Sequence, residues 1–570
     1  MKNSEIAKIF YAMADILEMK NIQWKPNAYR KAARSIEMLS EAIEDIYKRG
    51  GIKALEEIPG VGIHLATKIE EFLRIDKVKS YEEMKKSMPV NVEELMRVEG
   101  LGPKKIMLLY KKLRIRNIAE LEKAAQAGKL RKISTLGEKT EANILKAIEF
   151  TKMSGKRKLL GVALPIARKI EGDLKKQKFI DKVIVCGSIA RRLETIGDID
   201  VLITTKFPKE AMDFFTTMKG ANRIVAKGPT KSTIVYGNVE VDARVIDPES
   251  FGSATQYFIG SKDHNIALRR IAIKKGYKLS EYGLFKGNKK IAGKTEEEVY
   301  NKLGMTWMPP ELRENHGEIE AAQKNKLPKL IELKDIVGDL QMHTTYSDAE
   351  NTVEEMAQAC KSLGYKYCAI TDHVGTTGIT NPMNLKRTLQ QKKEIEKVNS
   401  KLKGFTVLQG AEVDIKLNGE LAAESEQLKQ YDVVLVAIHQ GMKRDKAQQT
   451  ERIINAMKNR YTTIISHPTG REINERPGYQ LDFEKVFKAA KENNVAMEIN
   501  SFPARLDLND VNARAAKDFG VMLSIGTDAH QIGQLSLMEY GVSVARRAWC
   551  EKKDIINTLS VEQLLKRIRR

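Results

Sequence analysis

Cysteine is scarce in this chain of 570 residues, and the four cysteines form no Cys-x-x-Cys pair. This scarcity excludes a disulfide-stapled fold and a thiolate zinc site, and it favours a reducing compartment. The sequence also lacks an apolar run long enough to cross a bilayer, and its charged, amphipathic N-terminus does not read as a signal sequence. We therefore expect a cytoplasmic protein without a membrane partner.

Positive charge is plentiful but unevenly distributed. The formal net charge is +22, whereas residues 331–570 carry 34 basic and 32 acidic side chains, so nearly all the excess lies in residues 1–330. A basic region of this size predicts a polyanionic partner that is bound through its phosphates. The alternative is that a lysine-rich composition reflects a hot environment.

Three aspartates are the first candidates for catalysis. Asp198 and Asp200 begin an apolar run, and residues two apart in a strand share one face. Asp242 lies in the alternating run 239–245. Three neighbouring carboxylates suit a pair of Mg²⁺ ions that support phosphoryl transfer. A lone Asp-x-Asp pair is more often a solvated strand end, so the prediction depends on the surrounding motif.

That motif is Cys186-Gly-Ser-Ile-Ala-Arg-Arg-Leu-Glu-Thr-Ile-Gly-Asp-Ile-Asp200. Its Gly-Ser pair ends the preceding apolar run. Ser188 and the backbone N–H groups around Gly187 could hold a phosphate chain that faces the metals. With Arg191 between the Gly-Ser pair and the aspartates, the pattern predicts nucleotidyl transfer.

Glycine-containing turns between apolar helical segments mark the first part of the chain. Pro59-Gly-Val-Gly62 predicts a helix-hairpin-helix turn, which recurs in residues 98–106 and less clearly in residues 135–144. Such turns expose backbone N–H groups to a phosphate oxygen. One copy could be an ordinary helix connection, but repeated copies in a basic region favour binding to the DNA backbone.

Residues 1 to about 315 resemble the family X DNA polymerases, the group of DNA polymerase beta. The similarity is carried by Trp24-Lys-Pro-Asn-Ala-Tyr-Arg-Lys-Ala-Ala33, the first hairpin and the Gly-Ser and aspartate motif. The resemblance implies that Asp198, Asp200 and Asp242 hold two Mg²⁺ ions and that Asp242 accepts the proton of the primer 3′-hydroxyl. It implies that Gly187, Ser188 and Arg191 hold the triphosphate. Ala190 and Arg192 stand where the family has Arg and Gly.

The resemblance also implies a nucleotide-binding hinge in residues 256–269. There Tyr257 and Phe258 would pack against the sugar, near the backbone of Gly260. Asn265 would bond the minor-groove edge of the incoming base, and Arg269 would reach the template strand. Without the upstream motif, the two aromatic residues would be interpreted as core packing.

In family members with 5′-deoxyribose-phosphate lyase activity, a lysine at the position of Lys68 forms a Schiff base. Lys25 and Tyr29 match residues near the 5′-phosphate, whereas His64 replaces a lysine of polymerase beta. Lys68 is therefore a candidate catalytic residue. The alternative is a solvated helix lysine that only touches phosphate.

Five histidines in the C-terminal part end short strand-like runs or follow them closely. They are His343, His373, His439, His467 and His530, and they are accompanied by Asp348, Glu412 and Asp528. Helical segments separate the runs, as at 353–363, 385–402 and 483–493. Alternating strands and helices with polar residues at the strand ends predict a barrel whose carboxyl ends carry the site. Five such histidines with three carboxylates favour metal binding.

These motifs resemble the PHP (polymerase and histidinol phosphatase) domain over residues 336–570. The resemblance implies up to three ions: one at His343, Glu412 and Asp528, one at Glu412, His439 and His467, and one at Asp348, His373 and His530. The family's opening His-x-His is Gln341-Met-His343 here, so one imidazole is replaced. Imidazole-rich sites favour Zn²⁺, Mn²⁺ or Fe²⁺ over Mg²⁺. The implied activities are 3′-5′ exonuclease and AP (abasic-site) endonuclease.

We expect a multidomain protein with α-helical N-terminal domains, an α+β nucleotidyltransferase palm and a distorted (β/α)7 PHP barrel. The expected domains are 1–85 (lyase-like), 86–155 (helical, DNA-binding), 156–255 (palm), 256–315 (thumb-like), 316–335 (linker) and 336–570 (PHP). This order is typical of the bacterial and archaeal branch of family X. The predicted function is gap-filling DNA synthesis in repair by a monomer that binds gapped or primer-template DNA and dNTPs.

Three alternatives remain. The PHP domain could be structural and weakly active beside a working polymerase in a protein that binds DNA ends. A DNA-end scaffold with both sites silent would not need the three aspartates. An RNA-directed nucleotidyltransferase would lack the lyase-like domain.

Overall fold

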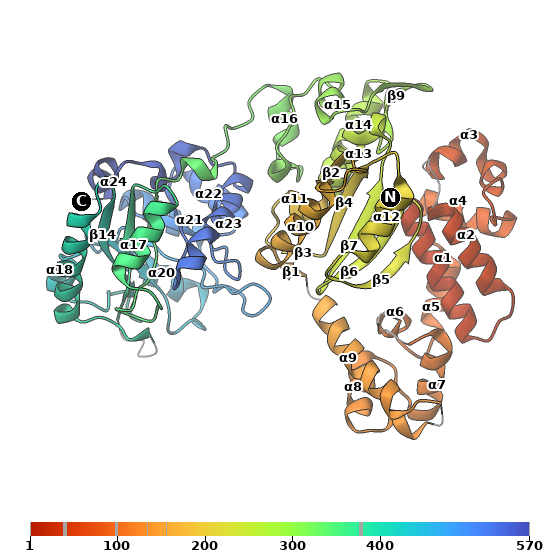
Figure 1. The fold of residues 1–570 in the computed structure, drawn as a ribbon, viewed down its shortest axis with the longest axis horizontal. Helices are drawn as coiled ribbons and strands as arrows, with labels where there is room; N and C mark the ends of the chain where they lie inside the picture. The colour runs from red at the N-terminus through yellow and green to blue at the C-terminus, as the bar shows by residue number, and fades with distance from the viewer. Residues whose placement is uncertain are drawn as a thin grey trace. The chain divides into compact units, whose positions relative to one another are not determined.

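The computed structural model describes residues 2–37, 43–96, 98, 101–133, 135–155, 157–375 and 380–568. The chain divides into two compact units, Met1–Lys156 and Arg157–Arg570 (Figure 1). No helix in the described ranges is both long and apolar enough to cross a membrane.

The first unit consists of helices joined by short turns. They are α1 (Lys2–Met19), α2 (Lys25–Glu37), α3 (Ile43–Glu56), α4 (Ile63–Ile75), α5 (Lys79–Lys86), α6 (Val92–Leu95), α7 (Pro103–Leu113), α8 (Ile118–Gln126), η1 (Leu130–Lys132) and α9 (Glu138–Gly155). Apolar residues three and four apart, such as Leu65, Ile69 and Phe72 on α4, bury one face in a common core.

Three turns of this unit share one backbone pattern. In each, an amide donates to the carbonyl three residues earlier, and a glycine then precedes the next helix. The donors and acceptors are Val61 and Ile58 before Gly62 and α4, Leu101 and Val98 before Gly102 and α7, and Leu136 and Ile133 before Gly137 and α9. The third copy, which is less clear in the sequence, therefore has the same local hydrogen bonding as the first two.

A mixed sheet lies at the centre of the second unit. Its strands are β2 (Lys182–Val185), β4 (Asp198–Thr204), β7 (Val239–Val245), β6 (Lys231–Tyr236) and β5 (Ala221–Lys227), in that spatial order. Only the β4–β7 pair is parallel. We call it the central sheet. The short strands β1 (Lys158–Leu159) and β3 (Thr195–Ile196) pair separately.

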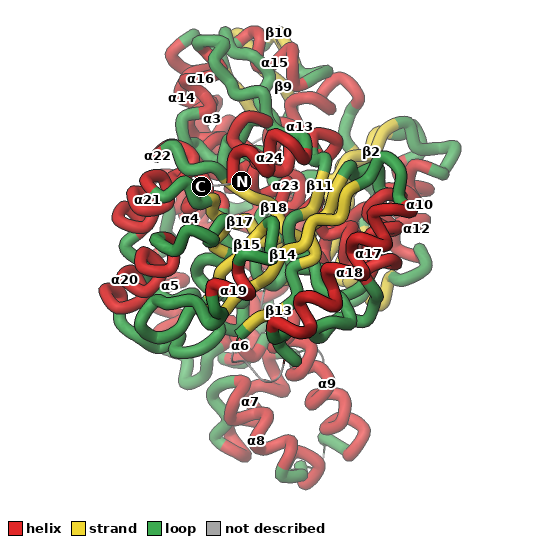
Figure 2. The backbone as a smooth tube through the Cα atoms, turned by 90° about the vertical axis from the view of Figure 1, so that its left-hand side faces the viewer, coloured by secondary structure: helices red, strands yellow, loops and turns green. Residues whose placement is uncertain are grey.

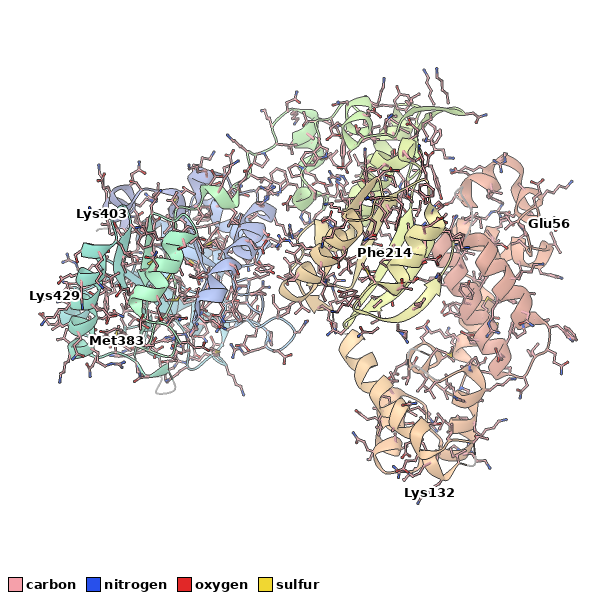
Figure 3. All side chains as sticks on the ribbon, viewed as in Figure 1. Glu56, Lys132, Phe214, Met383, Lys403 and Lys429 are labelled. Atoms are coloured by element: carbon pink, nitrogen blue, oxygen red, sulfur yellow. The ribbon has the colours of Figure 1, made fainter. Side chains whose placement is uncertain are left out.

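Alternation along β4 gives the central sheet two different faces. Ile199, Val201 and Ile203 pack into the cluster formed with α10 (Leu160–Lys175) and α12 (Pro208–Thr217). Phe214 of α12 packs edge-to-face on Phe179, with ring centroids 6.3 Å apart (Figure 3). The opposite face, with Leu202, packs against α13 (Phe251–Ile259).

The segment that follows the central sheet forms its own small core. It contains η2 (Pro248–Ser250), α13, α14 (Lys262–Lys274), the antiparallel strands β8 (Lys278–Ser280), β9 (Gly283–Lys286) and β10 (Lys289–Ala292), α15 (Glu296–Lys302) and η3 (Pro310–Leu312). The expected linker at 316–335 contains α16 (Glu318–Gln323), whose Ile319 and Ala322 are buried in this core. The linker is therefore partly a packed helix.

The C-terminal barrel is a run of seven parallel strands in sequence order. They are β11 (Gly338–Asp339), β12 (Tyr367–Ile370), β14 (Thr406–Asp414), β15 (Val433–Ala437), β16 (Ile464–Ile465), β17 (Ala496–Asn500) and β18 (Leu523–Gly526), and β13 (His373–Val374) also pairs with β14. A parallel bridge between Met342 and Ala529 joins the two ends of the run. Several of these strands lie side by side in Figure 2. The structure thus confirms a nearly closed seven-stranded barrel.

Helices connect the barrel strands and cover them. They are α17 (Val353–Ser362), α18 (Leu385–Lys401), α19 (Ser425–Leu428), α20 (Lys446–Met457), α21 (Phe483–Glu492), α22 (Asp510–Phe519), α23 (Met538–Arg547) and α24 (Val561–Ile568), with the short helices η4 (Leu333–Asp335), η6 (Ile532–Leu537), η7 (Lys552–Asp554) and η8 (Ile556–Thr558). Leu564 and Ile568 of α24 join an apolar cluster with strand residues Tyr367, Leu408 and Val433.

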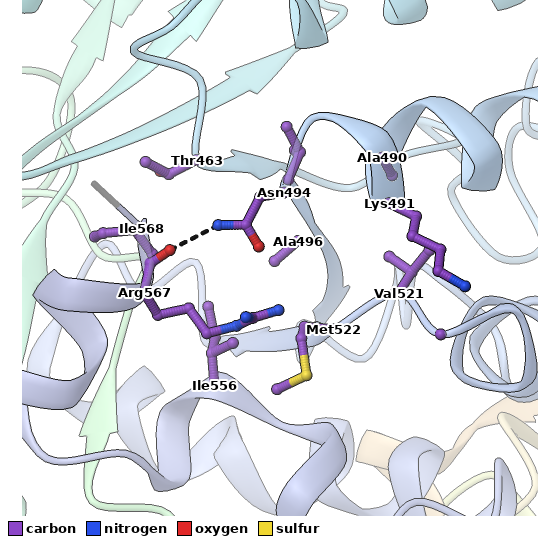
Figure 4. A pocket seen from close by; sticks show the side chains of 12 residues that line it. Thr463, Ala490, Lys491, Asn494, Ala496, Val521, Met522, Ile556, Arg567 and Ile568 are labelled. Atoms are coloured by element: carbon purple, nitrogen blue, oxygen red, sulfur yellow. Dashed lines mark hydrogen bonds between the residues drawn. The ribbon is translucent and has the colours of Figure 1, made fainter. Parts of the chain in front are cut away.

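A pocket of about 90 Å³ lies where several barrel strands begin (Figure 4). Thr463, Val495 and Met522, each just before a strand, line it, and Asn494 donates to the Arg567 carbonyl at 2.7 Å. The predicted histidines lie at the other ends of the strands. The pocket is therefore separate from the candidate metal site.

One buried carboxylate holds the third turn of the first unit. Glu141 is 1% exposed and accepts hydrogen bonds from Leu130 N at 2.9 Å, Arg131 N at 3.0 Å and Arg131 Nε at 2.6 Å. We expect Glu141→Gln to lower the free energy of unfolding of this unit by about 2 kcal/mol, because it removes charge-assisted bonds from a buried group. Scanning calorimetry of the full chain would measure the change.

Glu138→Gln is the matched control. Glu138 pairs with the same Arg131 at 3.0 Å but is 78% exposed, so its loss should leave the transition unchanged. Equal effects of the two substitutions would contradict the proposed importance of Glu141.

Candidate active sites

The register of the central sheet brings two of the predicted aspartates side by side. Asp200 on β4 lies directly opposite Asp242 on β7, and Asp198 lies opposite Glu240. Paired residues of neighbouring strands point to the same face. Asp198, Asp200 and Asp242 therefore share the face that packs against α13, away from the apolar cluster of α10 and α12.

Burial and mutual repulsion both disfavour the charged form of one of these carboxylates, Asp200. Burial, followed by the Asp198 and Asp242 charges, raises the pKa of Asp200 to about 7. The Thr233 hydroxyl donates to Asp242 Oδ1 from the neighbouring strand β6. Among the described residues, the trio is not one of the groups whose ligand atoms all lie within 4.8 Å of one another. A divalent cation would offset the repulsion, so the donor set fits a hard metal ion.

The Gly-Ser turn packs directly on the aspartates. Gly187 adopts φ +73°, and a Cβ built there would lie 2.7 Å from Asp200 Oδ2. Glycine is required here because a side chain would both strain the backbone and clash with the carboxylate. The turn continues into α11 (Gly187–Ala190), where Ser188 is partly buried.

Arg191, which follows α11, is held by groups distant in the sequence. Its Nε donates to Glu314 Oε1 at 2.9 Å, and its Nη1 donates to the Ile259 carbonyl at 2.5 Å. Arg192, at the position of the family's glycine, adopts φ +57°. The backbone thus retains the left-handed conformation that glycine favours, although the residue is an arginine.

The predicted hinge residues surround the junction between α13 and α14. Tyr257 and Phe258 are in edge-to-face contact at 5.3 Å, and the Arg244 guanidinium lies 5.3 Å from the Phe258 ring. Asn265 Nδ2 donates to the Tyr257 carbonyl at 2.7 Å and to that of Gly260 at 3.1 Å. A Cβ on Gly260 would lie 2.6 Å from the Asn265 side chain.

In this structure the Asn265 amide therefore serves the hinge itself, where it also accepts from Gln256 at 2.8 Å. A contact to a base would require this amide to exchange partners. Arg269, one turn further along α14, donates through Nε to the Asn265 carbonyl at 3.3 Å.

The histidines of the barrel converge on Glu412, a buried carboxylate inside β14. His467 Nε2 lies 2.7 Å from Glu412 Oε1, and His439 Nε2 lies 3.4 Å from the same oxygen. His343 Nε2 and His373 Nδ1 lie 3.4 and 3.7 Å from Oε2. Four imidazoles therefore surround one carboxylate.

Two further carboxylates complete the arrangement. Asp528 Oδ1 lies 3.2 Å from His343 Nε2, and Asp348 lies 3.7 Å from His373 Nε2 and 3.6 Å from His530 Nε2. Within the described ranges, the candidate ligand atoms form three groups, each within 4.8 Å: His343-Asp348-His373-His530, His373-Glu412-His439 and His343-Glu412-Asp528. His373 belongs to two groups, and His467 contacts Glu412 next to them.

These separations fit metal ions. Two ligand atoms that each lie about 2.1 Å from one ion are about 3.0–3.4 Å apart at octahedral or tetrahedral angles. Both ring nitrogens of His343 are buried and form no hydrogen bond of good geometry with the described part of the chain. Buried imidazole nitrogens without well-aligned hydrogen bonds are costly unless a ligand satisfies them.

Sequence reasoning missed the groups that orient these candidate ligands. His439 Nδ1 lies 2.6 Å from Asp414 Oδ1, and Glu498 Oε2 accepts from His467 N at 2.7 Å. Asp372 accepts from Thr344 N at 2.8 Å and fixes the loop that leads to Asp348. Asp414 could have been found, because it lies two residues after Glu412 on the same strand face. Glu498 and Asp372 had no comparable signal.

Gln341, the departure from the His-x-His motif, is fully buried at the carboxyl end of β11. Among the residues that the structure describes, neither its Oε1 nor its Nε2 has a hydrogen-bond partner. The amide therefore occupies an imidazole position without being satisfied by the protein around it.

The candidate lyase residues belong to the first unit. Lys68 is partly buried on α4, and Lys25 begins α2. Tyr29, also on α2, packs edge-to-face on Phe10 at 5.5 Å, and burial raises its pKa.

Comparison with known proteins adds to this geometry. Residues 1–78 match a helix-hairpin-helix domain, 92–149 a SAM-like helix-hairpin-helix tandem, 254–314 the DNA polymerase beta thumb and 339–502 the PHP domain. A DNA polymerase/3′-5′ exonuclease PolX of Bacillus subtilis (strain 168) is 34% identical over 576 residues and 100% of both chains. The chain belongs to the PolX family.

The enzyme class follows from this membership: the chain is a DNA-directed DNA polymerase, a nucleotidyltransferase, with a 3′-5′ exodeoxyribonuclease. Shorter relatives match only part of the chain. A probable phosphatase of Thermoanaerobacter sp. (strain X514) is 31% identical over 39% of this chain and 91% of its own length. One from Acetivibrio thermocellus is 34% identical over 34% of this chain and 79% of its own length.

We expect Gly187→Ala to slow primer extension by about tenfold or more, because the new Cβ would displace the Asp200 carboxylate and strain the turn. Degradation of 3′ ends should continue at the normal rate. Gly172→Ala is the control, since a Cβ there meets no atom of the described residues within 4 Å. Normal synthesis by Gly187→Ala would show that the close approach to Asp200 is unimportant.

Removal of the Asp414 charge should weaken metal binding at the barrel. We expect Asp414→Asn to lower the affinity by about 10-fold, because the carboxylate orients His439 and increases its basicity. Metal content after dialysis, measured by plasma mass spectrometry, would detect the change. The control is Asp432→Asn. Asp432 is an exposed residue just before β15, so this variant should bind metal as the wild type does.

Proposed function

We propose that the protein fills short gaps during DNA repair, acting as a monomer on gapped or primer-template DNA with dNTPs. The parallel register that places Asp200 beside Asp242 is the observation that carries this proposal. The basic first part of the chain and its three hairpin turns support binding to DNA phosphates. The reducing, cytoplasmic location expected from the sequence is consistent with this role.

In the proposed polymerase site, Asp198, Asp200 and Asp242 would hold Mg²⁺. When bound, the ions would supply charge stabilisation to the phosphates and lower the pKa of the primer 3′-hydroxyl. Asp242 would accept the proton of that hydroxyl, and Thr233 would hold the Asp242 carboxylate in place. Asp200, whose pKa lies near neutrality in the free protein, would be ionised in the occupied site.

The remaining residues would bind and orient the nucleotide. Gly187, Ser188 and Arg191 would hold the triphosphate through backbone N–H groups, a hydroxyl and a guanidinium. Tyr257 and Phe258 would pack against the sugar, whose 2′ position would face the backbone at Gly260. Asn265 would leave its carbonyl partners to bond the base, and Arg269 would reach the template.

The barrel would degrade 3′ ends with Zn²⁺ or Mn²⁺ ions held by the eight residues His343, Asp348, His373, Glu412, His439, His467, Asp528 and His530. The imidazole-rich donor set and the ligand separations support this assignment. Asp414 and Glu498 would keep His439 and His467 oriented. Gln341 would leave one ion with a weaker ligand than the family's imidazole supplies.

Two finer activities belong to the same proposal. The barrel site could also cleave at abasic residues in duplex DNA, since it would act on the same type of phosphodiester bond. Lys68 would form a Schiff base with a 5′-deoxyribose phosphate, near Lys25 and Tyr29. Borohydride trapping of the wild type and Lys68→Ala on a 5′-incised abasic substrate would test the lyase role, which an equal yield from both would refute.

A substitution in the polymerase site or in the barrel site should reduce only the activity of that site. We expect Asp242→Asn to reduce primer extension on gapped DNA at least about 100-fold and to leave 3′ degradation intact, because the sites use separate carboxylates. His373→Ala should have the opposite effect. Asp213→Asn, which removes a surface ion pair with Lys227 on the other face of the central sheet, should change neither rate.

Persistent extension by Asp242→Asn would refute the assignment of Asp242 to the polymerase site. Equal loss of both activities in either variant would argue against two centres.

A further inference from the structure

An arginine of the C-terminal barrel contacts the arginine assigned to the triphosphate. Arg547 ends α23, and its Nη1 donates to the Arg191 carbonyl at 2.9 Å. The same nitrogen lies 3.1 Å from Glu314 Oε1, which also accepts from Arg191 Nε at 2.9 Å. One carboxylate oxygen is thus shared by two guanidinium groups.

A second carboxylate anchors Arg547 from the other side. Its Nε and Nη2 lie 2.8 and 2.7 Å from Asp510 Oδ2, at the first residue of α22. The side chains of Arg547, Arg191 and Glu314 are 8, 11 and 16% exposed. The network contains two positive and two negative groups, and its low exposure makes each partner important for the others.

Arg191 itself is fixed at two points of its planar group. Nε is bonded to Glu314, and Nη1 is bonded to the carbonyl of Ile259, the residue before the hinge glycine Gly260. Two bonds to a rigid guanidinium define its orientation. Loss of Arg547 would leave Glu314 with Arg191 as its one cation in this network and would remove the hydrogen bond to the Arg191 carbonyl.

We propose that Arg547 and Glu314 are positioning residues for the incoming nucleoside triphosphate. Arg547 holds Glu314 and the Arg191 carbonyl, and Glu314 together with Ile259 holds the Arg191 guanidinium in the orientation that receives the phosphates. The nuclease barrel therefore contributes to nucleotide binding at the central sheet. This inference rests on the proposed role of Arg191.

Steady-state gap filling by the full chain tests the inference. Arg547→Met should raise the KM for dNTP about five- to tenfold, within the range of coupling between contacting charged residues, with kcat within twofold and 3′ degradation unchanged. Arg547→Lys should give an intermediate KM, because one amine keeps the charge but cannot make all the contacts. Glu314→Gln should also raise KM, and it provides a second variant if Arg547→Met folds poorly.

Arg546→Met is the matched control. Arg546 neighbours Arg547 on α23 and pairs with a carboxylate of the same segment, Glu311, at 2.8 Å. Its loss removes an ion pair of the same kind that does not include Arg191, so the KM for dNTP should stay at the wild-type value.

Combining Arg547→Met with Arg191→Gln distinguishes the triphosphate role proposed for Arg191 from the positioning role proposed for Arg547 and Glu314. Arg191→Gln should raise KM, and Arg547→Met should add nothing further in that background, because both act through one group. An unchanged KM in Arg191→Gln would refute the triphosphate role itself. The positioning role alone would be overturned by a different result. In that case the KM for dNTP would rise in Arg191→Gln, but Arg547→Met and Glu314→Gln would both match Arg546→Met. Additive effects in the double variant would also overturn the positioning role.

Discussion

Parallel strands with a fixed hydrogen-bonded register hold together charged groups that would otherwise separate. In the central sheet, the β4–β7 ladder fixes Asp200 opposite Asp242, and the resulting proximity contributes to raising the pKa of Asp200. In the barrel, β14 carries Glu412 into a ring of four imidazoles. The backbone ladders supply the energy that opposes repulsion, and the groups they assemble gain most from a bound cation.

Each site lies opposite the part of the fold that stabilises it. On β4, alternate residues divide between the apolar cluster of α10 and α12 and the face with the aspartates. In the barrel, the strands begin in an apolar cluster that includes α24 and end at the histidines. This separation lets the core be dry and closely packed while the reactive side chains gather where loops can vary.

Much of this architecture was readable in the sequence because it depends on local order. A strand of period two specifies which aspartates share a face, and histidines at the ends of successive parallel strands must converge when the barrel closes. The third hairpin was less clear, since its turn lacks the Pro-Gly or Glu-Gly sequence of the other copies. Its backbone hydrogen bond and the glycine before α9 are nevertheless the same.

Contacts between distant segments were beyond such reasoning. Glu498 on β17 and Asp372, which lies between β12 and β13, support candidate metal ligands. The helix α16 packs in a segment expected to be a linker, and Asn265 bonds to hinge carbonyls rather than projecting freely. The sharing of Glu314 by Arg191 and Arg547 joins residues 123 and 233 positions apart in the chain. No spacing rule predicts such pairs.

The sequence by itself determined the chemistry of the candidate groups and the strand or helix that carries each one, because residue type and short-range periodicity are local properties. Only the tertiary structure decided the distances between them, which oxygen faces which ring, and which outer residues hold them in place. Those properties depend on how separate elements pack, and packing is a consequence of the whole chain rather than of any single motif.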